Sequence, residues 1–128
     1  MKKIFFFAFV VFYILAGIYH FVNPEFYYGL IPDYLPFPKL LNFASGFFEM
    51  LFGALVLFSK TRKIGGYGII ILLLLFIPSH MYFIQIGSCV EKGLCVSPWI
   101  SWTRLIAVHP LLLFWAWWVS QLKFNNED

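Results

Sequence analysis

The chain has 128 residues, of which 62% are hydrophobic, 23% aromatic and only 12% charged. An ordinary soluble domain carries about 25% charged residues, so this composition excludes that class and indicates an integral membrane protein. Because one span needs about 20 mostly apolar residues, the length allows at most four crossings in a single domain, residues 1–128. The net charge of +3 comes mainly from basic residues beside the apolar runs, which indicate topology and not a nucleic-acid surface.

Residues 4–22 form the first expected span. The preceding Met1-Lys2-Lys3 makes this run look like a secretory signal peptide, with Leu15-Ala16-Gly17 as the cleavage site. We reject this alternative because the apolar run continues to Val22, beyond the roughly 7–15 residues of a signal-peptide core. The segment is therefore expected to remain as a membrane helix.

One face of this first span carries polar and small residues. Tyr13, Gly17 and His20 recur at offsets of four and three, which places them on one side of a helix. We therefore expect His20 to point towards the other helices.

The loop at 23–39 is expected on the outer side of the membrane. Its four prolines exclude a long regular helix. Aromatic rings favour the headgroup level, so we expect the loop to lie flat on the interface and cover the helices, with a gate over a pocket as the alternative. The loop contains Pro24, Pro32, Pro36 and Pro38 among Phe26, Tyr27, Tyr28, Tyr34 and Phe37.

Glu49 is the most informative residue of the second expected span, residues 40–58. A carboxylate inside a membrane costs several kcal/mol unless it is paired, neutralised or facing water. One helix face carries Asn42, Gly46, Glu49 and Gly53, at offsets of four, three and four. Small residues on such a face predict tight helix packing, but packing alone does not call for Glu49, which must have a polar partner.

The third and fourth spans are expected at residues 66–85 and 99–119, joined by an outer loop, 86–98. This loop holds the only cysteines, Cys89 and Cys95. A disulfide persists outside the cytoplasm, so we expect a structural clip of the loop. The spacing is not C-x-x-C, which argues against redox exchange.

Prolines adjoin the polar residues of these two spans. Pro78 lies close to His80, and Pro110 directly follows His109. Each proline kinks its helix, removes an amide and frees the carbonyl four residues earlier, which here predicts a polar cavity beside the imidazoles. The freed carbonyls are those of Leu74 and Ile106.

Five ionisable side chains are expected in the outer half of the helices. Successive helices run in opposite directions, and depth along each can be counted at about 1.5 Å per residue. One or two such residues from every span then lie at similar depths, where they can converge. Arg104 and His109 are five residues apart, about 140° around an ideal helix, so they cannot both face the axis, and Arg104 could instead reach the interface. The candidate site consists of His20, Glu49, His80, Arg104 and His109.

Two kinds of ligand fit these residue types. Histidine and glutamate are suitable ligands for zinc, copper or iron, but their spacing matches no tight metal motif. Arginine and histidine can instead donate hydrogen bonds to the carbonyls of a quinone or another lipophilic ligand, with Glu49 relaying a proton. We therefore prefer the quinone-like ligand over a metal.

The distribution of basic residues sets the expected orientation. The side of a membrane protein that is richer in Lys and Arg is cytoplasmic, so we expect both termini inside, in a bacterial cytoplasmic membrane. Each span must satisfy its own backbone groups in lipid, so the predicted fold class is all-α, a transmembrane four-helix bundle. One side carries Lys2, Lys3, Lys60, Arg62, Lys63 and Lys123, and the other carries Lys39 and Lys92.

A series of short motifs runs through the chain in a fixed order. They are His20-Phe21-x-x-Pro24 with Tyr28, Pro32, Leu35 and Pro36, then Ser45-Gly46-x-x-Glu49, then Thr61-Arg62, then Pro78 and Arg104. This order resembles the DoxX-like family of small four-helix membrane proteins. The resemblance implies the fold, and it links the chain to quinone-coupled sulfur oxidation, membrane redox complexes or the assembly of other membrane proteins.

Two functions follow as hypotheses. The first is a redox-associated membrane subunit whose outer pocket binds a quinone-like or other lipophilic ligand, surrounded by membrane lipid and a redox partner. The second is a non-enzymatic partner that helps another membrane protein assemble, in which case the buried polar residues serve packing and partner contact. The sequence leaves open the substrate, the oligomeric state and whether the protein is an enzyme.

Overall fold

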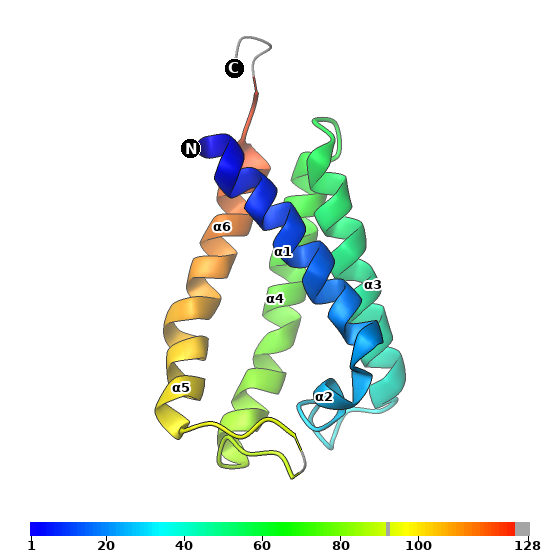
Figure 1. The fold of residues 1–128 in the computed structure, drawn as a ribbon, viewed down its shortest axis with the longest axis vertical. Coiled ribbons are helices and arrows are strands. Elements are labelled where there is room, and N and C mark those ends of the chain that lie inside the picture. Colours follow the sequence, from blue (N-terminus) through cyan, green and yellow to red (C-terminus); the bar gives the residue numbers. More distant parts are fainter. Residues whose placement is uncertain (92, 125–128) are drawn as a thin grey trace.

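The computed structural model describes residues 1–91 and 93–124, and these are helical apart from loops and one isolated β-bridge. The elements in chain order are α1 (Lys2–Val22), α2 (Pro24–Tyr28), α3 (Pro38–Leu57), α4 (Arg62–Gln85), α5 (Pro98–Thr103), the π-helix η1 (Arg104–Val108) and α6 (His109–Gln121) (Figure 1). The all-α prediction is confirmed. Three of these helices, α1, α3 and α4, are long and apolar enough to cross a membrane. Lys92, expected in the second outer loop, lies outside the described residues.

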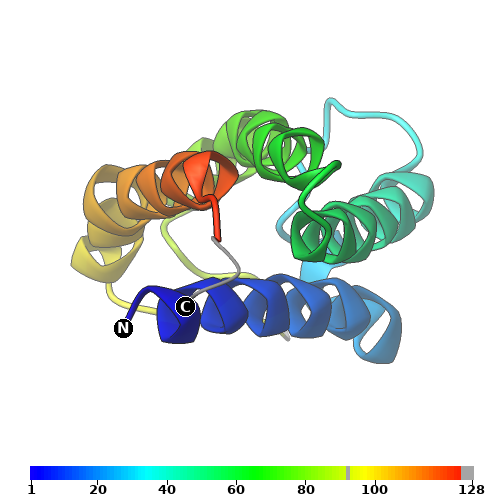
Figure 2. The same cartoon turned by 90° about the horizontal axis from the view of Figure 1, so that it is seen from above.

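The long helices run alternately up and down the molecule. The start of α1 and the end of α6 lie at the same end, and α2 and α5 lie at the other (Figure 1). Viewed from above, α4 lies between α3 and α6, and α1 lies across from it (Figure 2). We call the end with the start of α1 the terminal end and the opposite one the loop end.

The last helical segment is continuous from Pro98 to Gln121 but contains a π-helical turn. Its two α-helical parts have 6 and 13 residues, each shorter than the roughly 20 residues that a span requires. Pro110 has no amide hydrogen, so a regular α-helix would leave a carbonyl unpaired one turn earlier. Instead the His109 amide donates to the Arg104 carbonyl, five residues back. The kink predicted at Pro110 therefore takes the form of a widened turn.

Helices α1 and α3 approach each other closely at Gly17 and Gly46. A Cβ atom on Gly46 would lie 2.6 Å from His20 Cβ and 2.8 Å from the Gly17 carbonyl oxygen. Lipid tails are as apolar as helix surfaces, so helices in a membrane associate through close packing and interhelical hydrogen bonds. Only glycine fits here, and it brings polar side chains of α1 and α3 within bonding distance. The buried residues of α3 are Asn42, Gly46, Glu49, Gly53 and Val56, which confirms the predicted face.

The apolar core lies towards the terminal end, where α1, α3, α4 and α6 all contribute. Its buried members are Phe6, Phe9, Val10, Tyr13, Val56, Ile69, Leu72, Leu73, Ala116 and Val119. Their side chains gain many dispersion contacts, each worth only about 0.1–0.2 kcal/mol, so the packing stabilises through their number. The residues predicted as the candidate site, His20, Glu49, His80, Arg104 and His109, lie outside this core, whereas Tyr13 belongs to it.

Arg62 is buried at the terminal end, with 7% of its surface exposed. Its Nε donates to the Val56 carbonyl at 3.0 Å and its Nη1 to the Leu122 carbonyl at 2.9 Å. The last carbonyls of a helix have no partner within the helix and carry partial negative charge, so a guanidinium satisfies them well. The same group lies 4.8 Å from the Phe6 ring centroid and 5.0 Å from that of Phe124. Arg62 thus joins the ends of α3 and α6 to the start of α1.

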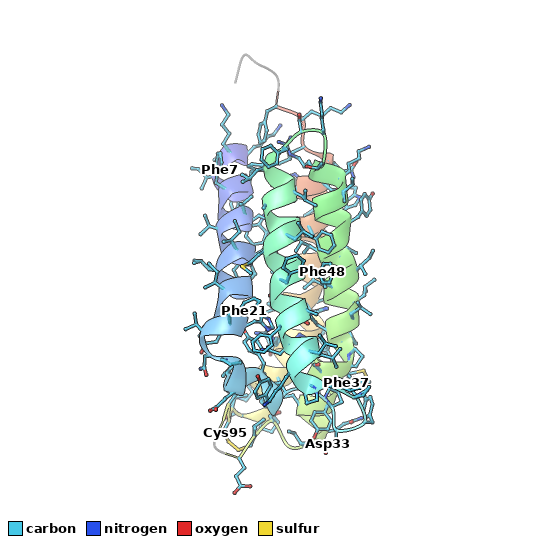
Figure 3. The ribbon with its side chains drawn as sticks, turned by 90° about the vertical axis from the view of Figure 1, so that its right-hand side faces the viewer. Phe7, Phe21, Asp33, Phe37, Phe48 and Cys95 are labelled. Carbon is cyan, nitrogen blue, oxygen red and sulfur yellow. A yellow bond between two sulfur atoms is a disulfide. The ribbon has the colours of Figure 1, made fainter. Side chains whose placement is uncertain are left out.

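The first expected outer loop contains only the five-residue helix α2, which begins at Pro24. The second outer loop forms a small hairpin closed by the predicted disulfide between Cys89 and Cys95. Asp33, Phe37 and Cys95 all lie at the end of the molecule opposite Phe7, so both loops cover the same end (Figure 3). They also touch, because a Cβ atom on Gly29 would meet the side chain of Val90.

Candidate functional site

His20 on α1 and Asn42 on α3 form the centre of the candidate site, with 7% and 2% of their surfaces exposed. Asn42 Nδ2 donates to the His20 carbonyl at 3.0 Å, and Asn42 Oδ1 lies 2.6 Å from His20 Nδ1. Because an amide oxygen only accepts hydrogen bonds, His20 Nδ1 must carry a proton. Asn42 therefore holds the imidazole in one orientation and leaves Nε2 for another partner.

Glu49 is the partner of that second nitrogen. Its Oε2 lies 3.1 Å from His20 Nε2, and both side chains are 8% exposed. The contact is an ion-pair contact without aligned hydrogen-bond geometry, since Glu49 Oε2 has no hydrogen-bond partner. With Nδ1 already protonated, a favourable contact needs one further proton, either on Nε2 facing a carboxylate or on Glu49 facing a neutral ring. One proton is therefore shared between His20 Nε2 and Glu49 Oε2 in this buried contact. The contact gives Glu49 the polar partner that its position requires.

Tyr27 on α2 covers the His20 ring. The two ring centroids are 3.8 Å apart and the planes differ by 12°. Burial raises the pKa of Tyr27 to about 12, the negative charge of Glu49 adds to this effect, and the positive charge of Arg104 opposes it. The Tyr27 hydroxyl therefore stays neutral at physiological pH, and the first outer loop lies over the His20–Glu49 pair, in the covering position expected for it.

His80 on α4 and His109 on α6 form a second pair. Their ring centroids are 5.1 Å apart in an edge-to-face arrangement. His109 is 3% exposed, and its Nε2 donates to the Leu73 carbonyl at 2.7 Å. A carbonyl beside an imidazole was expected near Pro78, but the carbonyl that His109 uses is that of Leu73 and not of Leu74. The bond ties α6 to α4 through a backbone carbonyl of the helix that contains Pro78.

Arg104 is an exposed residue at the start of the π-turn. The expectation that Arg104 and His109 point about 140° apart assumed an ideal α-helix. The segment instead contains a π-turn, in which the His109 amide bonds to the Arg104 carbonyl. The two side chains still do not both face the axis, since His109 is 3% exposed whereas Arg104 is exposed. The charge of Arg104 lies within electrostatic range of Tyr27, His80 and His109. The five predicted residues thus divide into two pairs and one arginine, whose charge acts on the His80–His109 pair and on Tyr27, the residue that covers the other pair.

Buried polar atoms without hydrogen-bond partners accompany these pairs. Among the described side chains they include the Tyr13 hydroxyl and Glu49 Oε2, whose one contact is the ion pair with His20. Tyr13 is 2% exposed, its Cβ would contact a Cβ atom on Gly53 at 3.3 Å, and its hydroxyl lies within electrostatic range of Glu49 and Arg104. A buried hydroxyl without a partner costs about 1–3 kcal/mol, so these atoms have unused capacity to bind a polar group.

Sequence reasoning missed two members of this site. Asn42 was placed on the polar face of α3, but only the close approach of α1 shows that it fixes the His20 ring. Tyr13 was placed on the same face as His20, which was the available signal, but its hydroxyl was not proposed as a donor.

Metal binding has little support from the geometry. Within residues 1–91 and 93–124, no three His, Cys, Asp or Glu side chains are grouped so that they could hold a metal ion. His20 in particular has both ring nitrogens engaged, Nδ1 with Asn42 and Nε2 with Glu49.

Comparison with known proteins gives a family and no function. No curated protein and no solved structure matches the chain. Residues 9–120 match the family described as Domain of unknown function (DUF8561). Because this match spans most of the chain, the protein belongs to the DUF8561 family.

Proposed function

We propose that the protein is a transmembrane four-helix bundle with both termini on the cytoplasmic side of a bacterial membrane. Three helices have the length and apolarity of spans, and the continuous segment from Pro98 to Gln121 supplies the fourth. The terminal end carries the exposed residues Lys2, Lys60 and Lys63, which favours its placement inside. The DoxX-like resemblance supports the same architecture.

We further propose that the half of the bundle near the loop end binds the polar headgroup of a lipophilic, quinone-like ligand. The observation that carries this proposal is the buried Tyr13 hydroxyl, which has no partner and lies within electrostatic range of Glu49. In lipid no water competes for such a group, so a ligand oxygen is its natural partner.

Each residue then has a defined role. Tyr13 donates a hydrogen bond to a ligand oxygen. The His20–Glu49 pair holds one proton, which it can give to or take from that oxygen, while Asn42 keeps the ring in place. Arg104 supplies positive charge that favours the partial negative charge of a ligand carbonyl oxygen.

A co-purification experiment tests this function. The full chain is extracted from native membranes in mild detergent, and bound quinones are measured by mass spectrometry and absorption. We compare the wild type with Glu49→Gln and His80→Ala, and use Tyr19→Phe as the control because it removes an exposed hydroxyl from the same helix as Tyr13. We expect a bound quinone in the wild type and the control, and a loss of about threefold to tenfold in Glu49→Gln.

The other outcomes have clear meanings. Equal recovery of quinone in all variants would overturn the site as described. A well-folded protein that carries no ligand but brings down one reproducible membrane protein would overturn the ligand proposal in favour of an assembly role.

A further inference from the structure

An apolar groove runs between α1 and α6, apart from the residues of the candidate site. Its volume is about 450 Å³, and it is lined by Phe5, Leu111, Leu112, Phe114, Trp115 and Trp118. Helix α1 starts beside α6 and ends beside α3, so the two helices diverge with distance from the terminal end (Figures 1 and 2). The groove therefore opens sideways, where a membrane protein meets lipid.

A basic hollow follows the groove at the terminal end. Its volume is about 570 Å³, and it is lined by Met1, Lys2, Lys3, Gln121, Leu122, Lys123 and Phe124. Lys2 precedes Phe5 by three residues and Gln121 follows Trp118 by three, so the hollow lies one helical turn beyond the groove on both helices. The groove and the hollow thus succeed each other along one seam.

Arg62 fixes the floor of the hollow. Its Nη1 donates to the Leu122 carbonyl, and its guanidinium lies against the Phe124 ring, which in turn packs on Phe6 with ring centroids 5.1 Å apart. The chain after α6 is therefore held in place where Lys123 lines the hollow. This gives the hollow a defined shape and not only a loose set of lysines.

We propose that this seam binds one anionic phospholipid from the leaflet at the terminal end. Its phosphate lies in the basic hollow and one acyl chain lies in the groove. The groove and hollow extend along α6 from Leu111 to Gln121, ten steps of about 1.5 Å or about 15 Å in all, which is half of the roughly 30 Å hydrocarbon thickness of a bilayer. The length of the seam therefore matches the thickness of the hydrocarbon layer of one leaflet.

The charge of the hollow selects the headgroup. Lys2 and Lys123 line it, and none of the described residues that line it is acidic. A zwitterionic lipid brings its own cation into this positive field, whereas an anionic headgroup does not. A second copy of the chain is a poorer occupant, because its terminal end is also basic.

The headgroup contact is tested by native mass spectrometry of the detergent-purified full chain with equal amounts of phosphatidylglycerol and phosphatidylcholine. We compare the wild type with Lys2→Gln/Lys123→Gln. The matched control is Lys60→Gln/Lys63→Gln, which removes the same charge from the same end but away from the hollow. We expect selective retention of one phosphatidylglycerol by the wild type and the control, and a loss of about tenfold in Lys2→Gln/Lys123→Gln. Equal losses in both pairs, or no preference for phosphatidylglycerol, would overturn the proposal.

The acyl-chain contact is tested by Leu111→Trp. Leu111 lines the groove and is 67% exposed, so a larger side chain there fills the groove without entering the core. We expect this variant to melt like the wild type and to retain several-fold less phosphatidylglycerol. Unchanged retention would show that the lysines act without the groove and would overturn the seam as the binding site.

Discussion

Asn42 and His20 exchange two contacts across the interface of α1 and α3: the amide nitrogen donates to the His20 carbonyl at 3.0 Å, and the amide oxygen lies 2.6 Å from Nδ1. Because the first bond fixes which end of the amide faces the ring, the protonation of Nδ1 follows directly. Nε2 is then left to Glu49, so one amide determines how the buried acid is paired.

Asn42→Ala is therefore expected to destabilise the protein. It leaves a ring N–H and a backbone carbonyl without partners in a buried place, at a cost of about 1–3 kcal/mol. Thermal unfolding in detergent, followed by circular dichroism, measures the effect. Ser45→Ala is the control, because Ser45 bonds only within its own helix, to the Leu41 carbonyl, and we expect little change there. Similar melting of both variants would contradict the role of Asn42.

Arg62→Lys is expected to destabilise the protein although the charge is kept. A lysine cannot reproduce the fork of donors that reaches the Val56 and Leu122 carbonyls, nor the contact with two rings, so we expect a loss of about 2 kcal/mol. Denaturant unfolding in detergent gives this value. Lys63→Gln, at the exposed neighbouring position, should unfold like the wild type. If Arg62→Lys behaves like Lys63→Gln, the joining role of Arg62 is wrong.

Removal of the disulfide is expected to loosen both outer loops together. The disulfide joins cysteines six positions apart. Closing a loop of this length lowers the entropy of the unfolded chain, which stabilises the folded protein by about 2 kcal/mol. In Cys89→Ser/Cys95→Ser we expect faster hydrogen exchange in the hairpin and also in α2, because Val90 packs against Gly29. Faster exchange in the hairpin alone would show that the two loops are independent.

The orientation can be checked with alkaline phosphatase fusions, since this enzyme is active only outside the cytoplasm. Basic residues at the terminal end predict an inactive fusion after Lys60 and an active one after Glu91. The reverse pattern would place the termini outside and invert the proposed topology.

The sequence was sufficient for features that depend on one helix at a time. The spacing of Asn42, Gly46, Glu49 and Gly53 predicted the buried face of α3, and the expected location of Cys89 and Cys95 outside the cytoplasm predicted their disulfide. Helical periodicity and membrane topology determine such features locally.

Features that depend on two helices could not be predicted in the same way. Which side chain meets His20 depends on how closely α1 and α3 approach at Gly46. Arg62 is buried, but it was interpreted as a topology signal because a basic residue beside a membrane span usually is one. The π-turn between Arg104 and His109 was not predicted, because the ideal geometry of 3.6 residues per turn does not hold next to Pro110.

The central claim is that the buried Tyr13 hydroxyl binds an oxygen of a lipophilic ligand, and calorimetric titration of a short-tailed benzoquinone into the detergent-purified full chain tests it most directly. We predict saturable binding in the wild type and in Tyr19→Phe, and an affinity about threefold to tenfold lower in Tyr13→Phe, which loses one hydroxyl from the same helix. Equal affinity in Tyr13→Phe and Tyr19→Phe, or no saturable binding to the folded wild type, would contradict the account.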